Sequence, residues 1–457
     1  MKPVDLQTIQ QWTGARVVGN SAGIWASGLS TDSRTVRPGE LFVALRGETF
    51  DGHRFVSEAL NRGAVAALVE AAWLESHSDV AAQTLMAVPS TLAALADIAR
   101  EYRRGFAIPV VGVTGSAGKT TAKEMMAAVL GQRYCVLSNR GNENNEIGVP
   151  NTLLQLDDRH EIAVLELAAR KAGDIGYLCA IAQPTMGVLL NVGNAHLEFF
   201  GSVERVAKTK GELLGYLRES STALINVDDC VVVKEAKRTK GRLFGFSIRR
   251  ESEFRGERLV FDQEGCGRFS LQNTSFHLRV PGRHNVYNAL AAVGVGHLSG
   301  VTLPACAAAL ETFQPVTMRS HLRRHRGWML LDDSYNANPE SVRAALDVVG
   351  SIQAARRIAV LGDMLELGRA GPELHAGIGR DVVSAGVDRL FTTGSLSRHT
   401  AAAAVAAGLA DAAVQHCQTL SDLENKLHAV LQAGDIVLVK GSRAMQLEQV
   451  VDSMLHW

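Results

Sequence analysis

The chain has 457 residues, of which 46% are hydrophobic and 21% charged. It is too long for a single hydrophobic core, and its composition is typical of a folded globular protein rather than a disordered one. Its 47 basic and 47 acidic side chains cancel. This balance excludes the strong net field with which a nucleic-acid-binding or membrane-surface protein attracts its partner.

Six cysteines lie scattered along the chain without the paired spacing of a metal site, which favours free thiols in a reducing compartment. No stretch reaches the ~18 continuous apolar residues of a membrane span, and the first residues lack the apolar core of a signal peptide. We therefore expect a cytoplasmic protein without membrane insertion.

Residues 1–85 predict a small mixed α/β domain, with short strands at 40–45 and 64–69 around a helix near 54–62. Residues 86–314 form the predicted central domain, which opens with a helix at 91–104. Strands and helices then alternate, which predicts a doubly wound, mostly parallel sheet. Its expected strands are at 108–113, 161–167, 186–192 and 223–227. Short alternating segments between 242 and 280 predict an antiparallel extension.

Residues 315–457 repeat strand–helix units, which predicts a Rossmann-like third domain. The expected strands are at 328–332, 357–362, 388–393 and 435–440, and an alanine-rich run at 401–413 predicts a packed helix. A short basic cluster at 319–326 precedes the first of these strands. The fold class is thus α/β, in three domains.

A glycine-rich turn joins the strand at 108–113 to a helix predicted at 119–130, and it has the features of a phosphate-binding loop. Its residues are Gly115, Ser116, Ala117, Gly118, Lys119, Thr120 and Thr121. The backbone N–H groups and the helix dipole would cradle phosphates, Lys119 would neutralise them, and the Thr120 hydroxyl would bind Mg²⁺. Ala117 stands where the general pattern has glycine. The alternative is a glycine-rich turn with a chance lysine.

Two further side chains follow predicted strands of the same sheet. Glu166 lies in the strand at 161–167, and His196 follows the strand at 186–192. The carboxyl ends of parallel strands form one edge of a sheet, where ligands bind. These residues are therefore candidate metal ligands. Each could instead be an ordinary solvated or hydrogen-bonded side chain. Imidazole is an unusual ligand for Mg²⁺, so Mn²⁺ is also possible.

Several motifs occur in the order found in the Mur ligases, the ATP-dependent amide-forming enzymes of bacterial cell-wall synthesis, and the chain resembles this family nearly end to end. They are residues 31–34, 38–44, 51–53, 114–121, 282–292 and 331–339. Segments 141–150 and 361–368 are similar to the branch that adds D-alanyl-D-alanine. The resemblance implies a UDP-sugar-binding first domain, a central ATPase domain and a ligase domain.

The implied reaction joins D-alanyl-D-alanine to UDP-N-acetylmuramoyl-tripeptide. The tripeptide carboxylate would attack the γ-phosphate of ATP, and the amine would displace phosphate from the resulting acyl phosphate. Lys119, two metal ions and Arg319 would supply the positive charge that phosphoryl transfer needs. The resemblance does not decide between diaminopimelate and lysine as the third residue of the tripeptide. It leads us to expect a monomer.

The resemblance also implies contacts for each ligand. Asn285 and Asn288 would bind adenine, although helix capping before a helix at 289–295 is the alternative. Asp333 would accept from the ribose hydroxyls. The implied UDP contacts are Thr31, Ser33, Glu48, Thr49 and Phe50, and Asn144 and Asn145 would lie near the sugar-peptide.

In this family a carbamylated lysine ligates the second metal. Matching the family segment that follows the metal-binding histidine to this sequence favours Lys210 over Lys208. Metal ligands would then be Thr120, Glu166, His196 and Lys210. The alternative for Lys210 is an ordinary solvated lysine on an amphipathic helix. One departure from the family pattern is Ala168, where glycine is expected, and it bears on the local backbone geometry.

Two other functions remain open at the level of sequence. One is a nucleotide-binding regulatory or scaffold protein without turnover. The other is a ligase of the same mechanism that adds a different amino acid.

Overall fold

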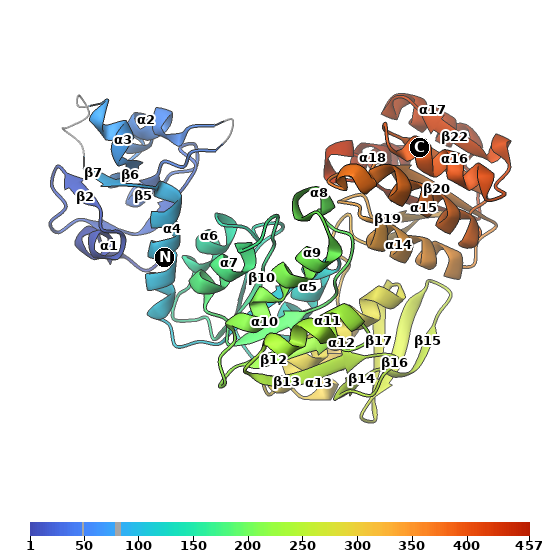
Figure 1. Cartoon of the computed structure of the whole chain (residues 1–457), viewed down its shortest axis with the longest axis horizontal. Helices are drawn as coiled ribbons and strands as arrows, with labels where there is room; N and C mark the ends of the chain where they lie inside the picture. The colour runs from blue at the N-terminus through green and yellow to red at the C-terminus, as the bar shows by residue number, and fades with distance from the viewer. Residues whose placement is uncertain (48–49, 78–83) are drawn as a thin grey trace. The chain divides into compact units, whose positions relative to one another are not determined.

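The structure is a computed structural model that describes residues 1–47, 50–77 and 84–457 (Figure 1). By its backbone contacts the chain divides into two compact units. The first comprises Met1–Gly112, Tyr134–Ala168 and Asp174–Met186, and the second comprises Val113–Arg133, Ala169–Gly173 and Gly187–Trp457.

The amino-terminal sheet has the strand order β2-β7-β6-β5-β4, with β2 antiparallel and the other pairs parallel. The strands are β2 (Arg16–Val18), β4 (Gly28–Ser30), β5 (Glu40–Val43), β6 (Ala66–Glu70) and β7 (Leu85–Val88), and β1 (Val4–Asp5) pairs with β3 (Trp25–Ala26). The nearby helices are α1 (Leu6–Thr13), α2 (Val56–Asn61), α3 (Ala71–Glu75) and α4 (Thr91–Arg104). Buried Phe42, Val56 and Val69 share one core. The predicted mixed α/β fold is confirmed.

The central sheet has the order β14-β13-β12-β11-β8-β10-β9. Its strands are β8 (Val110–Thr114), β9 (Val136–Ser138), β10 (Ile162–Glu166), β11 (Met186–Leu189), β12 (Thr222–Asn226), β13 (Arg242–Ser247) and β14 (Phe254–Arg255). Every residue of β8, β10 and β12 is buried, as expected for parallel strands covered on both faces. The predicted doubly wound architecture is confirmed.

The central helices alternate with these strands. They are α5 (Lys119–Leu130), α6 (Gly148–Leu153), α7 (Asp174–Ala182), α8 (Leu197–Phe200), α9 (Val203–Lys210), α10 (Glu212–Tyr216), α11 (Cys230–Glu235), α12 (Arg283–Leu298) and α13 (Leu303–Glu311). Helices α4 and α5 have the bounds that the sequence predicts.

The prediction of an antiparallel extension from 242 to 280 is wrong in its first half. Strands β13 and β14 continue the central sheet in parallel. Only the second half is antiparallel, and it consists of β15 (Glu257–Phe261), β16 (Cys266–Leu271) and β17 (Thr274–Pro281). Residues 242–244 of β13 are not buried while 245–247 are.

The carboxy-terminal sheet has the order β18-β19-β23-β20-β21-β22, parallel except for the edge strand β18. Its strands are β18 (His321–His325), β19 (Trp328–Asp332), β20 (Arg356–Gly362), β21 (Arg389–Thr393), β22 (Val414–Cys417) and β23 (Asp435–Lys440). The predicted Rossmann-like domain is confirmed. The basic cluster itself forms β18, because a charged strand suits the exposed edge of a sheet.

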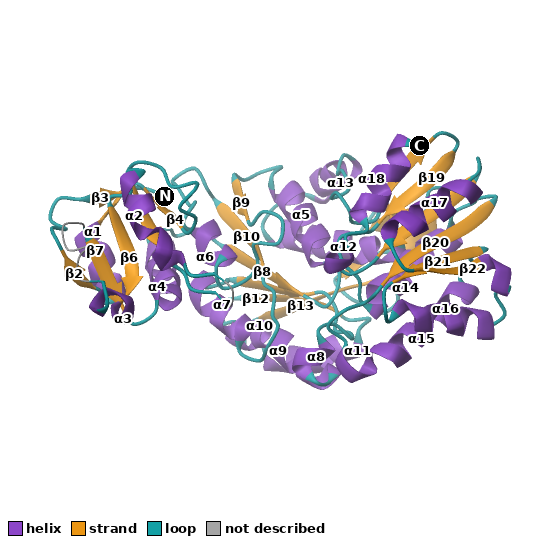
Figure 2. Cartoon of the chain, turned by 90° about the horizontal axis from the view of Figure 1, so that it is seen from above, coloured by secondary structure: helices purple, strands orange, loops and turns teal. Residues whose placement is uncertain are grey.

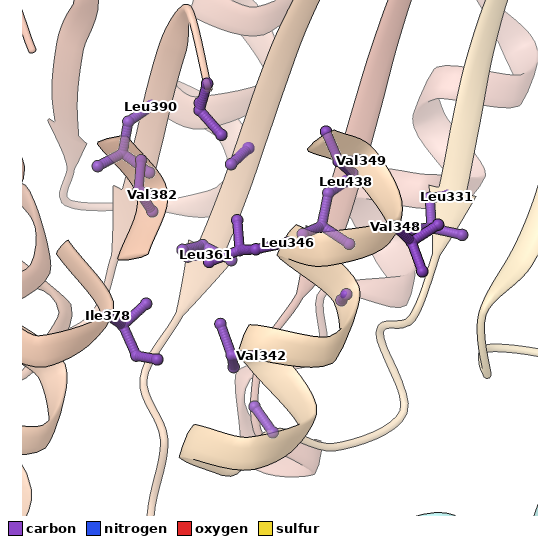
Figure 3. Packing of buried hydrophobic residues seen from close by; sticks show 14 of the residues in the cluster. Leu331, Val342, Leu346, Val348, Val349, Leu361, Ile378, Val382, Leu390 and Leu438 are labelled. Atoms are coloured by element: carbon purple, nitrogen blue, oxygen red, sulfur yellow. The ribbon is translucent and has the colours of Figure 1, made fainter. Parts of the chain in front are cut away.

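Helices cover both faces of this sheet (Figure 2). They are α14 (Pro339–Ser351), α15 (Gly371–Ser384) and α16 (Ser397–Ala406) on one face and α17 (Leu420–Val430) and α18 (Glu448–His456) on the other. Alternate strand residues face the two layers, so Leu331 and Leu438 pack with Leu346 of α14 (Figure 3), whereas Leu330 and Val437 pack with α17 and α18. This is the period of two expected of strands.

The predicted helix at 401–413 is only partly correct. Helix α16 ends at Ala406, and Gly408 follows with a φ of 110°, a left-handed conformation that glycine adopts without strain. The three domain boundaries proposed from the sequence stay predictions, although β7 extends the amino-terminal sheet to Val88. Among the described helices, none is long and apolar enough to cross a membrane.

Candidate active site

The predicted phosphate loop joins β8 to α5, which begins at Lys119 as expected. Gly118 has a φ of 80°, and a Cβ there would lie 2.6 Å from Oδ1 of Asn288. Both the backbone and the close neighbour therefore require glycine at this position. Lys119 Nζ donates to the carbonyl of Gly115 at 2.9 Å. The lysine thus folds back over the loop at the positive end of the α5 dipole.

Asn191 fixes the conformation of the loop through side-chain hydrogen bonds, and this residue was not predicted. Its Oδ1 accepts hydrogen bonds from the backbone N–H groups of Ser116 and Ala117 at 3.0 and 2.8 Å. Its Nδ2 donates to the carbonyl of Ala117 at 3.0 Å. Asn191 could have been predicted from the sequence, because an asparagine shortly after a buried strand of this sheet lies on the same edge as the phosphate loop.

Asn285 and Asn288 lie inside α12, which begins at Arg283. The alternative that they cap a helix is therefore wrong, and so is the later start at 289. Asn285 Nδ2 donates to the carbonyl of Pro281 at 2.8 Å, and Asn288 Nδ2 donates to Asn285 Oδ1 at 3.0 Å. Both are buried, and Asn288 lies against Gly118 of the loop.

Glu166 ends β10, as predicted, and its side chain is only 2% exposed. Its Oε1 accepts from Asn144 Nδ2 at 2.8 Å. Asn139, another residue that the sequence analysis missed, accepts from the N–H of Glu166 at 2.9 Å and donates to its carbonyl at 3.1 Å. Asn145 instead accepts from the N–H of Gly148 at the start of α6. The first unit thus brings Asn144 to Glu166.

Alanine at position 168, where the family pattern has glycine, causes no backbone strain. Ala168 does not have a positive φ, so a methyl group is tolerated where the family has glycine. Its N–H donates to the carbonyl of Asn144 at 2.9 Å.

His196 does not follow a strand end directly, because β11 stops at Leu189. It stands just before α8 with a φ of 56°. Its Nδ1 lies 2.5 Å from Oε2 of Glu366, a residue after β20 that the sequence analysis did not single out. The hydrogen bond from His196 lowers the pKa of Glu366, against the effect of burial.

Lys210 is the last residue of α9 and is 2% exposed, whereas Lys208 is exposed. The alternative of a solvated lysine at 210 is therefore wrong. Of the two lysines, only Lys210 is therefore enclosed by the protein.

Arg319 and Asp333 are the candidate site residues of the carboxy-terminal part. Arg319 precedes β18, and Asp333 directly follows β19. Asp333 accepts from the N–H of Ser320 at 2.8 Å and pairs with Lys440 at 2.5 Å. Lys440 is buried and also donates to the carbonyl of Asn336. The Arg319 guanidinium lies 4.0 Å from the ring centroid of Tyr335, a cation–π contact. Lys440 and Tyr335 were not predicted.

Two residues at the start of α14 contact the central loops of the same unit. Glu340 Oε1 accepts from the N–H and Nδ2 of Asn194 at 2.9 and 2.6 Å. A Cβ on Gly193 would lie 2.5 Å from Glu340 Cδ, so a larger residue there would have to displace the Glu340 side chain. Asn338 Nδ2 donates to the carbonyl of Ser116 at 3.3 Å. The segment from Asn191 to His196 therefore touches both the phosphate loop and the carboxy-terminal sheet's helices and loops.

Three of the predicted uridine contacts, Thr31, Ser33 and Phe50, belong to segments that follow β4 and β5 of the amino-terminal sheet. Thr31 follows β4 directly, Ser33 is buried, and Phe50 is exposed and stacks on Phe55 at 5.4 Å. Glu48 and Thr49 lie outside the described residues. Since β4 and β5 are parallel neighbours, the segments that follow them emerge at the same edge.

The residues that the sequence assigns to a metal fit a divalent cation in their chemistry. They offer a hydroxyl, a buried carboxylate, an imidazole and a buried lysine, and the carbamate of a lysine would add oxygen ligands. Within residues 1–47, 50–77 and 84–457, no three His, Cys, Asp or Glu side chains cluster tightly enough to hold a metal by themselves.

Three family models match the chain in order. They are the Mur ligase family catalytic domain over residues 26–103, the Mur ligase middle domain over 113–296 and the Mur ligase glutamate ligase domain over 318–443. The chain is 37% identical over 455 residues to a UDP-N-acetylmuramoyl-tripeptide–D-alanyl-D-alanine ligase of Synechocystis, covering 99% of this chain and 97% of the relative.

Solved structures agree with this match. MurF from Acinetobacter baumannii superposes with a TM-score of 0.89 at 29% identity, and the match covers 100% of each chain. MurF ligase from Thermotoga maritima in complex with ADP gives a TM-score of 0.83 at 31% identity, covering 94% of this chain and 97% of that one. The chain belongs to the Mur ligase family.

Proposed function

We propose that the chain is the ATP-dependent ligase that joins D-alanyl-D-alanine to UDP-N-acetylmuramoyl-tripeptide in peptidoglycan precursor synthesis. The products are UDP-N-acetylmuramoyl-pentapeptide, ADP and phosphate. The observation that carries this function is full-length similarity, at 32–37% identity, to relatives that bear this ligase's name. The three-domain Mur ligase architecture supports it.

The reaction has two chemical steps. A carboxylate oxygen of the tripeptide attacks the γ-phosphorus of ATP, and ADP leaves with the electrons of the broken P–O bond. The amine of D-alanyl-D-alanine then adds to the acyl carbon, loses a proton and expels phosphate. We assign Lys119 and Arg319 to neutralise the transferring phosphoryl group, and the contact of Lys119 Nζ with the Gly115 carbonyl supports the first assignment.

We assign adenine to Asn285 and Asn288 and the ribose to Asp333. The burial of Asn285 and Asn288 and the contact of Asn288 with Gly118 support the adenine assignment. Asp333 is paired with Lys440, so ribose would have to share or displace that contact. The loop residues Gly115, Ser116, Ala117, Gly118, Thr120 and Thr121 would bind the phosphates.

We assign two Mg²⁺ ions, replaceable by Mn²⁺, to Thr120, Glu166, His196 and carbamylated Lys210. A divalent cation would neutralise the phosphate oxygens and lower the charge barrier to attack by a carboxylate. In support of the assignment, Glu166 offers a carboxylate at the end of β10, and Lys210 is a buried lysine at the end of α9.

The uridine end of the substrate is assigned to Thr31, Ser33, Glu48, Thr49 and Phe50, and the sugar-peptide to Asn144 and Asn145. We further propose that the protein acts as a monomer in the cytoplasm and has no nucleic-acid partner. The balanced charge of the chain supports the last point.

An ADP-release assay with a panel of substrates tests the function. UDP-N-acetylmuramoyl-tripeptide and D-alanyl-D-alanine together should give ADP and a product of the mass of the pentapeptide. Omitting either substrate, or replacing the dipeptide with D-glutamate or an L-amino acid, should abolish product. Turnover with a different amino acid would favour a related ligase. ATP binding without any turnover would favour a regulatory protein.

A further inference from the structure

Two residues from distant parts of the second unit face each other in an uncommon backbone conformation. His196 has a φ of 56° and Glu366 a φ of 61°. Residues other than glycine rarely adopt this left-handed region, and it persists where the surrounding structure imposes it, most often at functional sites. The conformation of both residues therefore indicates that the contact between His196 and Glu366 has a functional role.

The segments that carry these residues dock at three points. Nδ1 of His196 lies 2.5 Å from Oε2 of Glu366. The N–H of Glu198 donates to the backbone carbonyl of Glu366 at 3.0 Å. A Cβ on Gly368 would lie 3.2 Å from the Cα of Glu198, so the two backbones approach closely. The imidazole ring is thus held by backbone and side-chain contacts together.

The hydrogen bond determines which ring nitrogen of His196 carries the proton. The Nδ1–Oε2 contact joins a ring nitrogen to a carboxylate oxygen, and a carboxylate accepts hydrogen bonds, so the tautomer that fits this contact carries its proton on Nδ1. The lone pair is then on Nε2, the nitrogen that remains available to a metal. Histidines that bind metals commonly donate their other N–H to a carboxylate in this way.

We propose that Glu366 is a positioning residue that fixes the tautomer and the orientation of His196 for metal binding. This inference rests on the proposed function, in which His196 is a metal ligand. A purely structural ion pair is the competing explanation. The His196 and Glu366 side chains are 26% and 34% exposed, and pairs exposed to this degree contribute little to stability.

The test is Mn²⁺ binding to the full chain with a non-hydrolysable ATP analogue, followed by electron paramagnetic resonance. The variants are His196→Ala, Glu366→Ala and Glu366→Gln, with Glu373→Gln on the exposed face of α15 as the control. Glu366→Ala should weaken one Mn²⁺ site by about 10- to 100-fold. Glu366→Gln should weaken it less, because its amide oxygen can still accept from Nδ1. The control should bind as the unmodified protein does.

A second readout follows the ring itself. The ¹⁵N spectrum of His196, assigned by its disappearance in His196→Ala, should show the Nδ1–H tautomer in the unmodified protein and a mixture of tautomers in Glu366→Ala. A structural ion pair would leave both the tautomer and the Mn²⁺ affinity unchanged.

The outcomes separate this inference from the function on which it rests. If His196→Ala weakens Mn²⁺ binding and Glu366→Ala does not, the positioning role is overturned and the metal assignment stands. If His196→Ala leaves Mn²⁺ binding unchanged, the metal assignment itself is wrong and the positioning role fails with it. Loss in both single variants, with no further loss in the double variant, supports the proposal.

Discussion

Lys208 and Lys210 stand two residues apart on α9, yet one is exposed and the other is buried. The helix turns by about 100° per residue, so neighbouring positions face different surroundings. Burial removes the hydration that stabilises an ammonium ion. The same side chain is therefore hydrated at position 208 and enclosed at position 210, the position to which we assign the carbamate.

Replacing Lys210 tests this difference. Lys210→Ala should abolish ligase activity, and acetate should restore part of it, because a small carboxylate can take the place of the lost carbamate. Lys208→Ala is the matched control and should retain near-normal kcat. Full activity of Lys210→Ala without acetate would rule out the carbamate.

Lys119 has a different role, since its Nζ already lies over the loop at Gly115. Lys119→Ala should lower kcat by about 100- to 1,000-fold, the usual cost of removing one charge-stabilising donor from a transition state. Steady-state kinetics and circular dichroism measure the two quantities needed, activity and fold. Near-normal phosphate release from a folded variant would contradict the phosphate-loop assignment.

At the scale of elements, helix α14 is held to the carboxy-terminal sheet by apolar packing. Leu346 is 1% exposed within a cluster that includes Leu361 and Leu438 (Figure 3). Leu346→Ala should lower the free energy of unfolding of this part of the chain by about 2–5 kcal/mol, because it removes buried methyl groups and leaves a cavity. Denaturant titration measures this loss. Leu243→Ala, at a side chain 47% exposed on β13, is the control and should cost far less.

Helix α12 also carries a partly buried titratable group, His284, near the segment that leads into β18. Burial lowers the pKa of His284 to about 4, and its Nε2 lies 3.2 Å from Ser320 Oγ. The unfolded chain, with a histidine pKa near 6.5, binds the proton first as the pH falls. This group therefore stabilises the fold above pH 6.5 and loses that contribution between pH 6.5 and 4.

The measurement is the unfolding midpoint Tm as a function of pH. Tm should fall from pH 6.5 to 4, and the fall should be smaller in His284→Gln. An identical pH dependence in the two proteins would show that folding does not lower the pKa of His284.

The sequence predicted long periodic elements and the residues of the phosphate loop well. Helices α4 and α5 match their predicted bounds, because apolar periodicity and glycine at the loop are local signals. The contacts of Asn191, Glu366 and Lys440 were not predicted. Each depends on a partner that is distant in the sequence, so only the packed tertiary structure brings them together.

The same reason explains the errors in secondary structure. The charged strand β18 is defined by pairing with β19 at a sheet edge rather than by its own hydrophobicity. The parallel pairing of β13 with β12 depends on the crossover between them, which the pattern within β13 does not reveal.

For the whole molecule, the proposed mechanism is that ATP activates the carboxylate of the UDP-linked tripeptide as an acyl phosphate. In that mechanism the oxygen that attacks the γ-phosphorus leaves with the phosphate when the amide forms. The most direct test is a reaction with tripeptide labelled with ¹⁸O in its terminal carboxylate, followed by mass spectrometry of the phosphate released. We predict that each labelled tripeptide that reacts releases one phosphate, and that this phosphate carries one ¹⁸O atom. Phosphate without label, formed in equal amount to the pentapeptide product, would contradict the mechanism.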